Sequence, residues 1–314
     1  MKLRDYDLLY DLPAGEYDGH GIDGVRTVTI RAGMGLEVMC CPIIKTGPDV
    51  KAEIRRRKTT PAMQKVNDRN RERKMMRLLD YNFTPGAVVF TGTYHYPSGD
   101  YGFMNLRELS DTYDKRGLPW DADRVKKDVR NFREKLKRLV VKAGGRAEDF
   151  KWIIRIEEGK QPPAEGLPPK YHIHAIFEGP GITRKAVEAL WPHGLTDAKH
   201  FDLEGDGAAR LARYLNKQKQ SGRWWSHSRN LKQPPKTVSE RKVSRRRLAM
   251  IAADVYRDGR GIMEKLYPGY RLMECTVHYS DYVAGAYIYA RMRQNQTDPP
   301  RGGSGTNTAR RRRE

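Results

Sequence analysis

The sequence has little cysteine and no long apolar segment. Its three cysteines, Cys40, Cys41 and Cys275, form no metal-binding spacing, and adjacent cysteines seldom pair with each other, so we expect no disulfide framework. No window of about 18 apolar residues occurs, and the first residues, MKLRDYDLLYDLPAGEYDG, carry acidic groups where a signal peptide needs an apolar run. These absences predict a soluble, cytoplasmic protein.

A phosphate-binding loop of the G-x-x-x-x-G-K-[ST] type is also missing, which excludes a helicase of that kind. Acidic residues are the other deficit: 39 Asp and Glu stand against 60 Lys and Arg, and the formal net charge is +21. This excess exceeds what solubility requires and favours a polyanionic partner, with nucleic acid ahead of a membrane surface. A ribosome-like or merely solvated basic surface is the alternative.

The hydrophobic patterns divide the chain into four segments. Residues 1–79 contain a strand pair and a basic helix, residues 80–233 form the main domain, and residues 234–292 hold a helix and a β-hairpin. Residues 293–314, rich in glycine, proline and arginine, are expected to be disordered. Strands and helices occur together throughout, which predicts an α+β protein.

The stretch YHIHAIF, residues 171–177, carries the first candidate site. Side chains alternate along a strand, so His172 and His174 share one face, where both rings could bind one metal ion. The preceding strand, KWIIRIEE, offers a carboxylate. Glu157 falls on the face opposite to the large apolar groups and is our preferred third ligand, with Glu158 as the alternative.

A later helix, DGAARLARYLNKQKQ at 206–220, carries an apolar stripe typical of a helix packed on a sheet. Tyr214 lies on the shoulder of this stripe rather than at its centre, where a core tyrosine would sit, and Lys217 follows one turn later.

In this order, HIH at 172–174 and YLNK at 214–217 resemble the metal and nucleophile motifs of HUH endonucleases of the rolling-circle replication initiator class. The resemblance extends to NFTPGAVVFTGTY, SRNLKQP, YPGY and SDYVAGAYIYARM, and so covers about residues 60 to 292. It implies a central antiparallel sheet of about five strands with helices packed on it, in a ferredoxin-like layout, plus N- and C-terminal extensions. It also implies metal-assisted nicking and rejoining of single-stranded origin DNA through a 5′-phosphotyrosine, with Mg²⁺ or Mn²⁺ as the expected divalent metal. Tyr214 would be the single nucleophile, and Lys217 would lower its pKa or hold a phosphate.

Several other residues are candidates for contacting DNA. The segment RWWSHSRNLKQPP interleaves aromatic and basic residues, a mixture suited to stacking on unpaired bases, although a tryptophan pair is also ordinary packing material. The full set of candidates is Thr91, Thr93, Arg155, Arg213, Trp224, Trp225, Arg229 and Lys232. Unwinding would need a separate helicase, because this chain lacks the phosphate-binding loop.

Two alternatives remain open. A conjugative relaxase or a single-strand transposase shares the HxH and tyrosine chemistry, but a relaxase usually places its tyrosine before the histidines, whereas Tyr214 follows them. From a different class, the chain could be a non-catalytic DNA-binding protein. The origin sequence, the oligomeric state, and whether the element is a plasmid, a phage or an integrated one are left open.

Overall fold

The computed structural model describes residues 24–43, 61–94, 122–159, 171–203, 206–216, 225–279 and 286–295. The fold is α+β, with two antiparallel five-stranded sheets and six α-helices in these ranges. The chain separates into two compact units, which are described one at a time. We call residues 46–236 with 31–33 the central unit, and residues 17–30, 34–45 and 237–314 the terminal unit.

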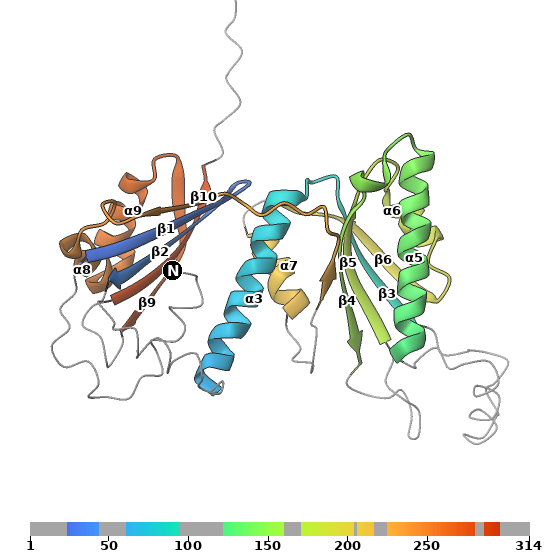
Figure 1. Cartoon of the computed structure of the whole chain (residues 1–314), viewed down its shortest axis with the longest axis horizontal. Helices are drawn as coiled ribbons and strands as arrows, with labels where there is room; N and C mark the ends of the chain where they lie inside the picture. Colours follow the sequence, from blue (N-terminus) through green and yellow to red (C-terminus); the bar gives the residue numbers. More distant parts are fainter. Residues whose placement is uncertain are drawn as a thin grey trace, which may run out of the picture. The chain divides into compact units, whose positions relative to one another are not determined.

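The sheet of the central unit has the strand order β6-β3-β5-β4-β7 (Figure 1). Its strands are β3 (Val88–Tyr94), β4 (Lys151–Glu158), β5 (Tyr171–Glu178), β6 (Gly194–His200) and β7 (Ser226–His227). All four pairings are antiparallel, and β5, the histidine strand, lies in the middle. The expected five-stranded antiparallel sheet is therefore present.

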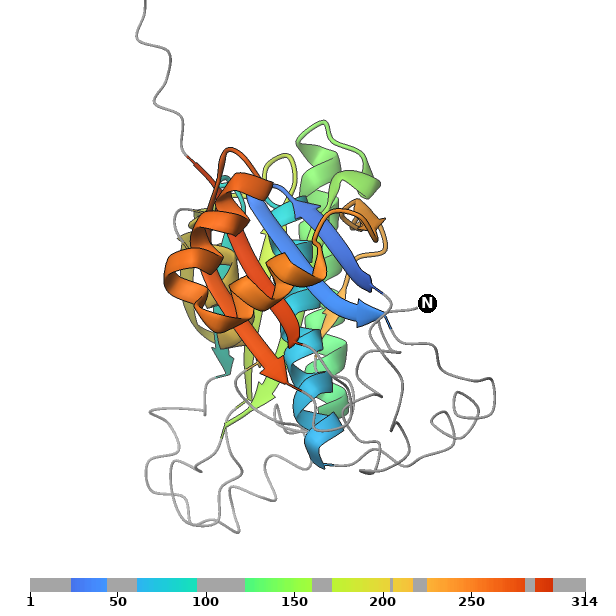
Figure 2. The same cartoon turned by 90° about the vertical axis from the view of Figure 1, so that its left-hand side faces the viewer.

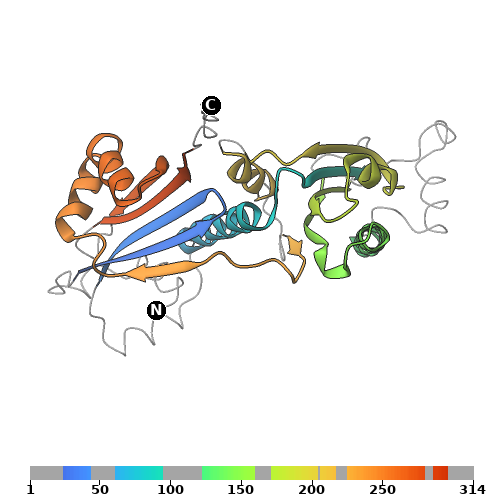
Figure 3. The same ribbon diagram turned by 90° about the horizontal axis from the view of Figure 1, so that it is seen from above.

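Helices cover both faces of this sheet (Figures 1 and 3). Helices α5 (Ala122–Lys142) and α6 (Arg184–Ala189) lie on one face, and α3 (Pro61–Asn82) and α7 (Gly207–Asn216) lie on the other. Helix α5 buries the apolar stripe that its sequence predicts. At its centre Phe132 contacts three other rings, with centroid distances of 5.5 Å to Phe90, 5.8 Å to Phe177 and 5.1 Å to Trp191.

The second core of the central unit lies between the sheet and helices α3 and α7. Leu78 and Leu79 from α3 and Ala212 from α7 pack there against Ile153 and Ile176 of the sheet. Ile176 belongs to the same face of β5 as the two histidines, because it is two residues beyond His174. The histidine face is therefore the face that carries the tyrosine helix.

The sheet of the terminal unit has the order β8-β1-β2-β10-β9. Its strands are β1 (Gly24–Ala32), β2 (Gly35–Ile43), β8 (Lys236–Ser239), β9 (Tyr270–Tyr279) and β10 (Ala286–Gln294). Helices α8 (Arg245–Ala253) and α9 (Arg260–Leu266) lie over one face (Figure 2). Leu248, Ile251 and Met263 from these helices pack with Val38 and Ile288 of the sheet.

This arrangement differs from a division into consecutive segments 1–79, 80–233 and 234–292. Strand β2 pairs with β10, placing Cys40 opposite Ile288, so the two ends of the described chain share one sheet. The basic helix, by contrast, packs within the central unit. Pairing between strands so distant in sequence leaves no signal in the local hydrophobic pattern, which is all that indicates segment boundaries in the sequence. Within the described ranges, no helix has the length and apolar character needed to cross a membrane.

Candidate functional site

Strand register assembles the candidate site on the histidine face of the central sheet. Residues directly opposite each other in an antiparallel pair point to the same face. β3 lies on one side of β5 and β4 on the other, so each histidine has one neighbour from each strand. The two resulting rows are Thr93–His172–Glu157 and Thr91–His174–Arg155.

The two threonines hydrogen-bond the imidazoles. Thr93 Oγ1 lies 3.0 Å from His172 Nδ1, and Thr91 Oγ1 lies 3.2 Å from His174 Nδ1. When each hydroxyl accepts a hydrogen bond from Nδ1–H, the Nε2 lone pair remains available for a metal, the usual arrangement behind a metal-ligating histidine. Thr91 and Thr93, which the sequence offers as DNA contacts, are thus engaged with the histidines.

Glu157 lies on the same face, and its Oε2 is 3.5 Å from His174 Nε2. Glu158 is exposed and pairs in register with Tyr171, on the opposite face. The structure therefore confirms that Glu157, and not Glu158, faces the histidines. Whether Glu157 binds a metal remains a prediction.

His172, His174 and Glu157 have the right chemical groups to bind a divalent ion, but their side chains are not arranged around one point. The two imidazole rings are nearly parallel, with centroids 6.4 Å apart, so they do not aim at one centre. Among the residues described, no group of three or more His, Cys, Asp or Glu side chains is arranged to hold a metal. Two imidazoles and one carboxylate are nevertheless chemically suitable ligands for a divalent ion.

His174 is neutral at pH 7. Burial, helped by the neighbouring His172 and Arg155, lowers its pKa to about 4. A neutral imidazole is the form that binds metals, so the environment of His174 keeps it ready to act as a ligand without loss of a proton.

Tyr214 reaches the same place from α7. Its hydroxyl lies 3.4 Å from His174 Nδ1, and the two rings meet edge to face with centroids 4.9 Å apart. Half of the Tyr214 side chain is exposed, so an incoming substrate can reach it. Burial of the remainder and the negative charge of Glu157 raise the pKa of Tyr214, while a hydrogen bond from Thr91 lowers it.

Arg155 holds the tyrosine helix. Its side chain is only 1% exposed, and its guanidinium donates to the backbone carbonyl of Leu215, in the last turn of α7. A cation is favourable at a helix C-terminus, where carbonyls lack partners and the dipole is negative. The same guanidinium lies 3.9 Å from Glu157. Arg155 is thus held inside the layer between sheet and helix, with no surface to offer to DNA.

The other candidates lie further out. Arg213 is half-exposed and paired with acidic groups, 3.6 Å from Glu72 and 3.0 Å from Asp206. Trp225 is half-buried against the second core, while Arg229 and Lys232 are exposed on the segment after β7. Lys217 and Trp224 lie outside the described residues.

Strand β6 adds two residues that the sequence reasoning missed. Asp197 stands opposite Thr91 and forms a 2.9 Å ion pair with Lys199. The charge of Asp197 raises the pKa of Tyr214, and that of Lys199 lowers it. The alternation of residues 194–200 places these charges on one face, but only the pairing of β6 with β3 shows that they flank the tyrosine.

Comparisons of the chain with protein-family models, with curated proteins and with solved structures gave no match. The side chains that the fold brings together are therefore the only guide to what this site could do.

Proposed function

We propose that the central unit is a nuclease domain of the HUH type, in the ferredoxin-like layout. We propose further that the chain is a rolling-circle replication initiator acting on single-stranded origin DNA in the cytoplasm. The observation that carries the proposal is the 3.4 Å approach of the Tyr214 hydroxyl to His174, a residue 40 positions away in the chain, on the face that also holds His172 and Glu157. Core packing of a buried histidine does not require contact with a half-exposed tyrosine. A strand-transfer site requires a tyrosine nucleophile that is open to substrate and lies next to the metal-binding histidines.

The reaction is a transesterification. The Tyr214 oxygen attacks the scissile phosphorus, the bond from phosphorus to the 3′-oxygen breaks, and the phenol proton ends on the released 3′-hydroxyl. The product is a 5′-phosphotyrosine and a free 3′-hydroxyl end. Because one ester replaces another, a 3′-hydroxyl can later reverse the step and rejoin strands without ATP.

Activation of Tyr214 depends on its neighbours. Its pKa is raised, so the phenol is protonated at neutral pH. The Thr91 hydroxyl can donate to the phenol oxygen while it accepts from His174 Nδ1–H, and a donor to the phenol oxygen favours the phenolate. Lys217, one turn beyond Tyr214 in the sequence, would add a cation that stabilises the phenolate or holds a phosphate oxygen.

His172, His174 and Glu157 would hold a divalent ion, Mg²⁺ or Mn²⁺, with the two histidines binding through Nε2. When bound, such an ion supplies a Lewis acid that polarises the scissile phosphate. By accepting a hydrogen bond from Nδ1–H, Thr91 and Thr93 would leave Nε2 of each histidine unprotonated, and Arg155 would hold the end of the helix that carries the nucleophile.

The partners follow from this chemistry. The substrate would be single-stranded DNA at an origin, and a separate helicase would supply it, since the chain lacks the phosphate-binding loop of such motors. With a single tyrosine, the second strand transfer at termination would use another subunit or a regenerated Tyr214.

Covalent capture tests the proposal. The full chain is incubated with Mn²⁺ and single-stranded oligonucleotides labelled at the 3′ end, and products are separated on a denaturing gel. We expect a labelled protein band that Tyr214→Phe and a chelator both abolish. Tyr171→Phe, on the opposite face of β5, is the matched control and should leave the band unchanged.

The outcome also separates the alternatives. Binding without an adduct across a broad oligonucleotide library would refute the enzyme and leave a non-catalytic DNA-binding protein. An adduct alone would be shared with relaxases and single-strand transposases. The DNA site distinguishes the three enzymes. An initiator cleaves and rejoins at a replication origin, a relaxase acts at an origin of transfer, and a transposase acts at the ends and insertion sites of its element.

A further inference from the structure

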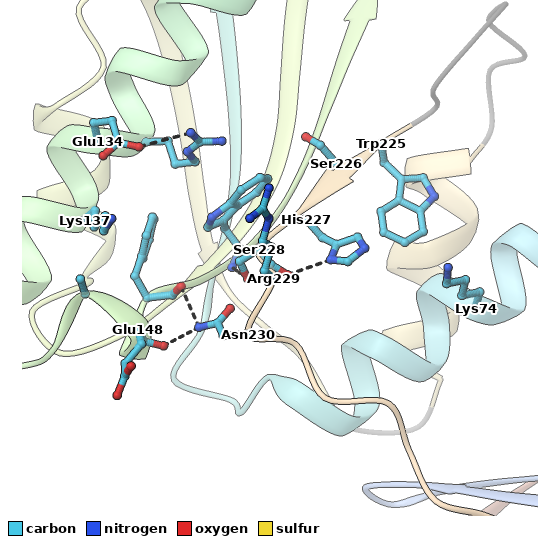
Figure 4. Close-up of a pocket in the computed structure, with 14 residues that line it drawn as sticks. Lys74, Glu134, Lys137, Glu148, Trp225, Ser226, His227, Ser228, Arg229 and Asn230 are labelled. Carbon is cyan, nitrogen blue, oxygen red and sulfur yellow. Dashed lines mark hydrogen bonds and ion pairs between the residues drawn. The ribbon is translucent and has the colours of Figure 1, made fainter.

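A groove lies at the open edge of the central sheet, beside the two-residue strand β7. Its volume is about 1010 Å³, at the upper end of the range for ligand sites. Figure 4 shows Lys137 on α5 along one wall and Lys74 on α3 along the other, with residues 225–230 between them. None of the residues proposed for catalysis lines this groove.

Aromatic rings line part of the groove. Trp152 of β4 is half-buried, and the guanidinium of Arg133 lies 4.8 Å from its ring centroid. Trp225 and His227 form an aromatic pair, with ring centroids 5.2 Å apart. Flat rings with partly open faces are the surfaces on which unpaired bases stack, and every base offers such a face whatever its sequence.

The charge of the groove is positive. Four cationic side chains and two carboxylates line it, and both carboxylates are already paired, Glu134 with Arg133 at 3.2 Å and Glu148 with Arg146 at 2.7 Å. The three cations that complete the lining form no ion pair within the described parts of the chain: they are Lys74, Lys137 and Arg229. They are therefore available to neutralise phosphates.

The wall that carries Trp225 and Arg229 is fixed to the sheet. The backbone N–H of Ser228 donates to the Trp152 carbonyl at 3.0 Å, and the N–H of Trp152 donates to Ser228 Oγ at 3.2 Å. Two residues further on, the Asn230 amide donates to the Phe150 carbonyl at 3.1 Å. A wall held in this way loses little conformational freedom on binding, which favours a preformed site.

We infer that this groove binds a segment of single-stranded DNA separate from the bond being cut, with a base stacked on Trp225 and the backbone neutralised by Lys74, Lys137 and Arg229. The choice of DNA rests on the proposed function. Such a site would hold the strand while Tyr214 is occupied by its covalent product, so that the two ends do not part between cleavage and rejoining.

Binding is measured by fluorescence anisotropy of a labelled oligo(dT) of about 12 nucleotides. The full chain carries Tyr214→Phe, so that no covalent capture contributes. Adding Trp225→Ala should weaken binding about 5- to 150-fold, the range for loss of one stacked base, while Trp225→Phe should retain most of the affinity. A duplex of the same length exposes no base faces and should be unaffected by Trp225→Ala.

The three cations are tested together by salt titration. Replacing Lys74, Lys137 and Arg229 by Gln should reduce the slope of log K against log [salt] by about 2, since each phosphate contact to a single strand contributes about 0.7. Lys127, Arg184 and Lys185 are exposed and do not line the groove. Their replacement by Gln is the matched control and should change the slope less.

Three results would overturn the inference: no binding of oligo(dT), unchanged affinity in Trp225→Ala, or an equal loss for single strand and duplex. An equal loss for single strand and duplex would indicate a general polyanion-binding surface. If the groove binds a peptide and not DNA, no binding of oligo(dT) would be seen. Failure of the proposed function looks different. There, no covalent adduct forms in the chain with Tyr214 intact, while binding that depends on Trp225 persists.

Discussion

Replacement of Arg155 by methionine tests how the tyrosine helix is held. Methionine keeps an apolar stem in the space between sheet and helix but removes the donor to the Leu215 carbonyl. A hydrogen bond from a charged donor contributes about 1.5–3 kcal/mol, and the carbonyl left behind has no new partner. The cost of burying the guanidinium, which lowers its pKa, is recovered at the same time.

We therefore expect Arg155→Met to reduce the free energy of unfolding of the central unit by about 2 kcal/mol. For a unit of this size that corresponds to a fall in melting temperature of about 4–8 °C. Calorimetry or thermal circular dichroism measures the shift. Arg155→Lys, which keeps the charge near Glu157 on a shorter donor, should fall between wild type and Arg155→Met.

The effect on chemistry should exceed the effect on stability. Loss of the hold on α7 displaces Tyr214, and a shift of about 1 Å at a reacting atom can cost about 100-fold in rate. Adduct formation, followed well below the melting temperature, should slow accordingly, while the salt dependence of oligonucleotide binding stays unchanged. Unchanged stability and rate, with a salt slope reduced by about 0.7, would show that Arg155 contacts phosphate and would refute our account.

Three further predictions concern the histidines and carboxylates. Thr93→Val removes the hydrogen bond to His172 Nδ1 and should weaken Mn²⁺ binding, measured by calorimetry, about 10- to 100-fold. Glu157→Gln should abolish Mn²⁺-dependent adduct formation and Glu158→Gln should not; the reverse result would contradict the assignment. The pKa of His174 is about 4 in the folded chain and about 6.5 unfolded, so the unfolded chain binds more protons between these values. Stability in chelator should therefore fall by up to about 3 kcal/mol as the pH drops from 6.5 to 4, and urea titrations of His174→Gln should lack that slope.

Local periodicity predicts much of the central unit. Alternation along a strand is enough to put His172 and His174 on one face and to prefer Glu157 over Glu158. The helical period is enough to place Tyr214 at the shoulder of its stripe. These features depend only on neighbours in the sequence, and the structure agrees with each of them.

What depends on pairing between distant strands could not be predicted. The register of β3 against β5 decides that Thr91 and Thr93 hydrogen-bond the histidines, and no local pattern encodes that register. Arg155 reads as a surface arginine until α7 is known to end over it. One sequence signal for the burial of Arg155 exists. This residue is flanked by isoleucines and lies on the strand face that an apolar helix covers, and a buried arginine must find a hydrogen-bond partner.

The strand pairing of the terminal unit affects the order in which the chain can fold during synthesis. Strands β1 and β2 leave the ribosome long before their partner, because β10, which pairs with β2, begins about 240 residues after β2 ends. At about 5–20 residues per second, the early strands wait roughly 12 to 50 s for their partner. The central unit is complete by residue 236, so we expect it to fold first. A chain truncated before β9 would retain the whole candidate active site but leave an unpaired strand edge, the kind of surface that drives aggregation.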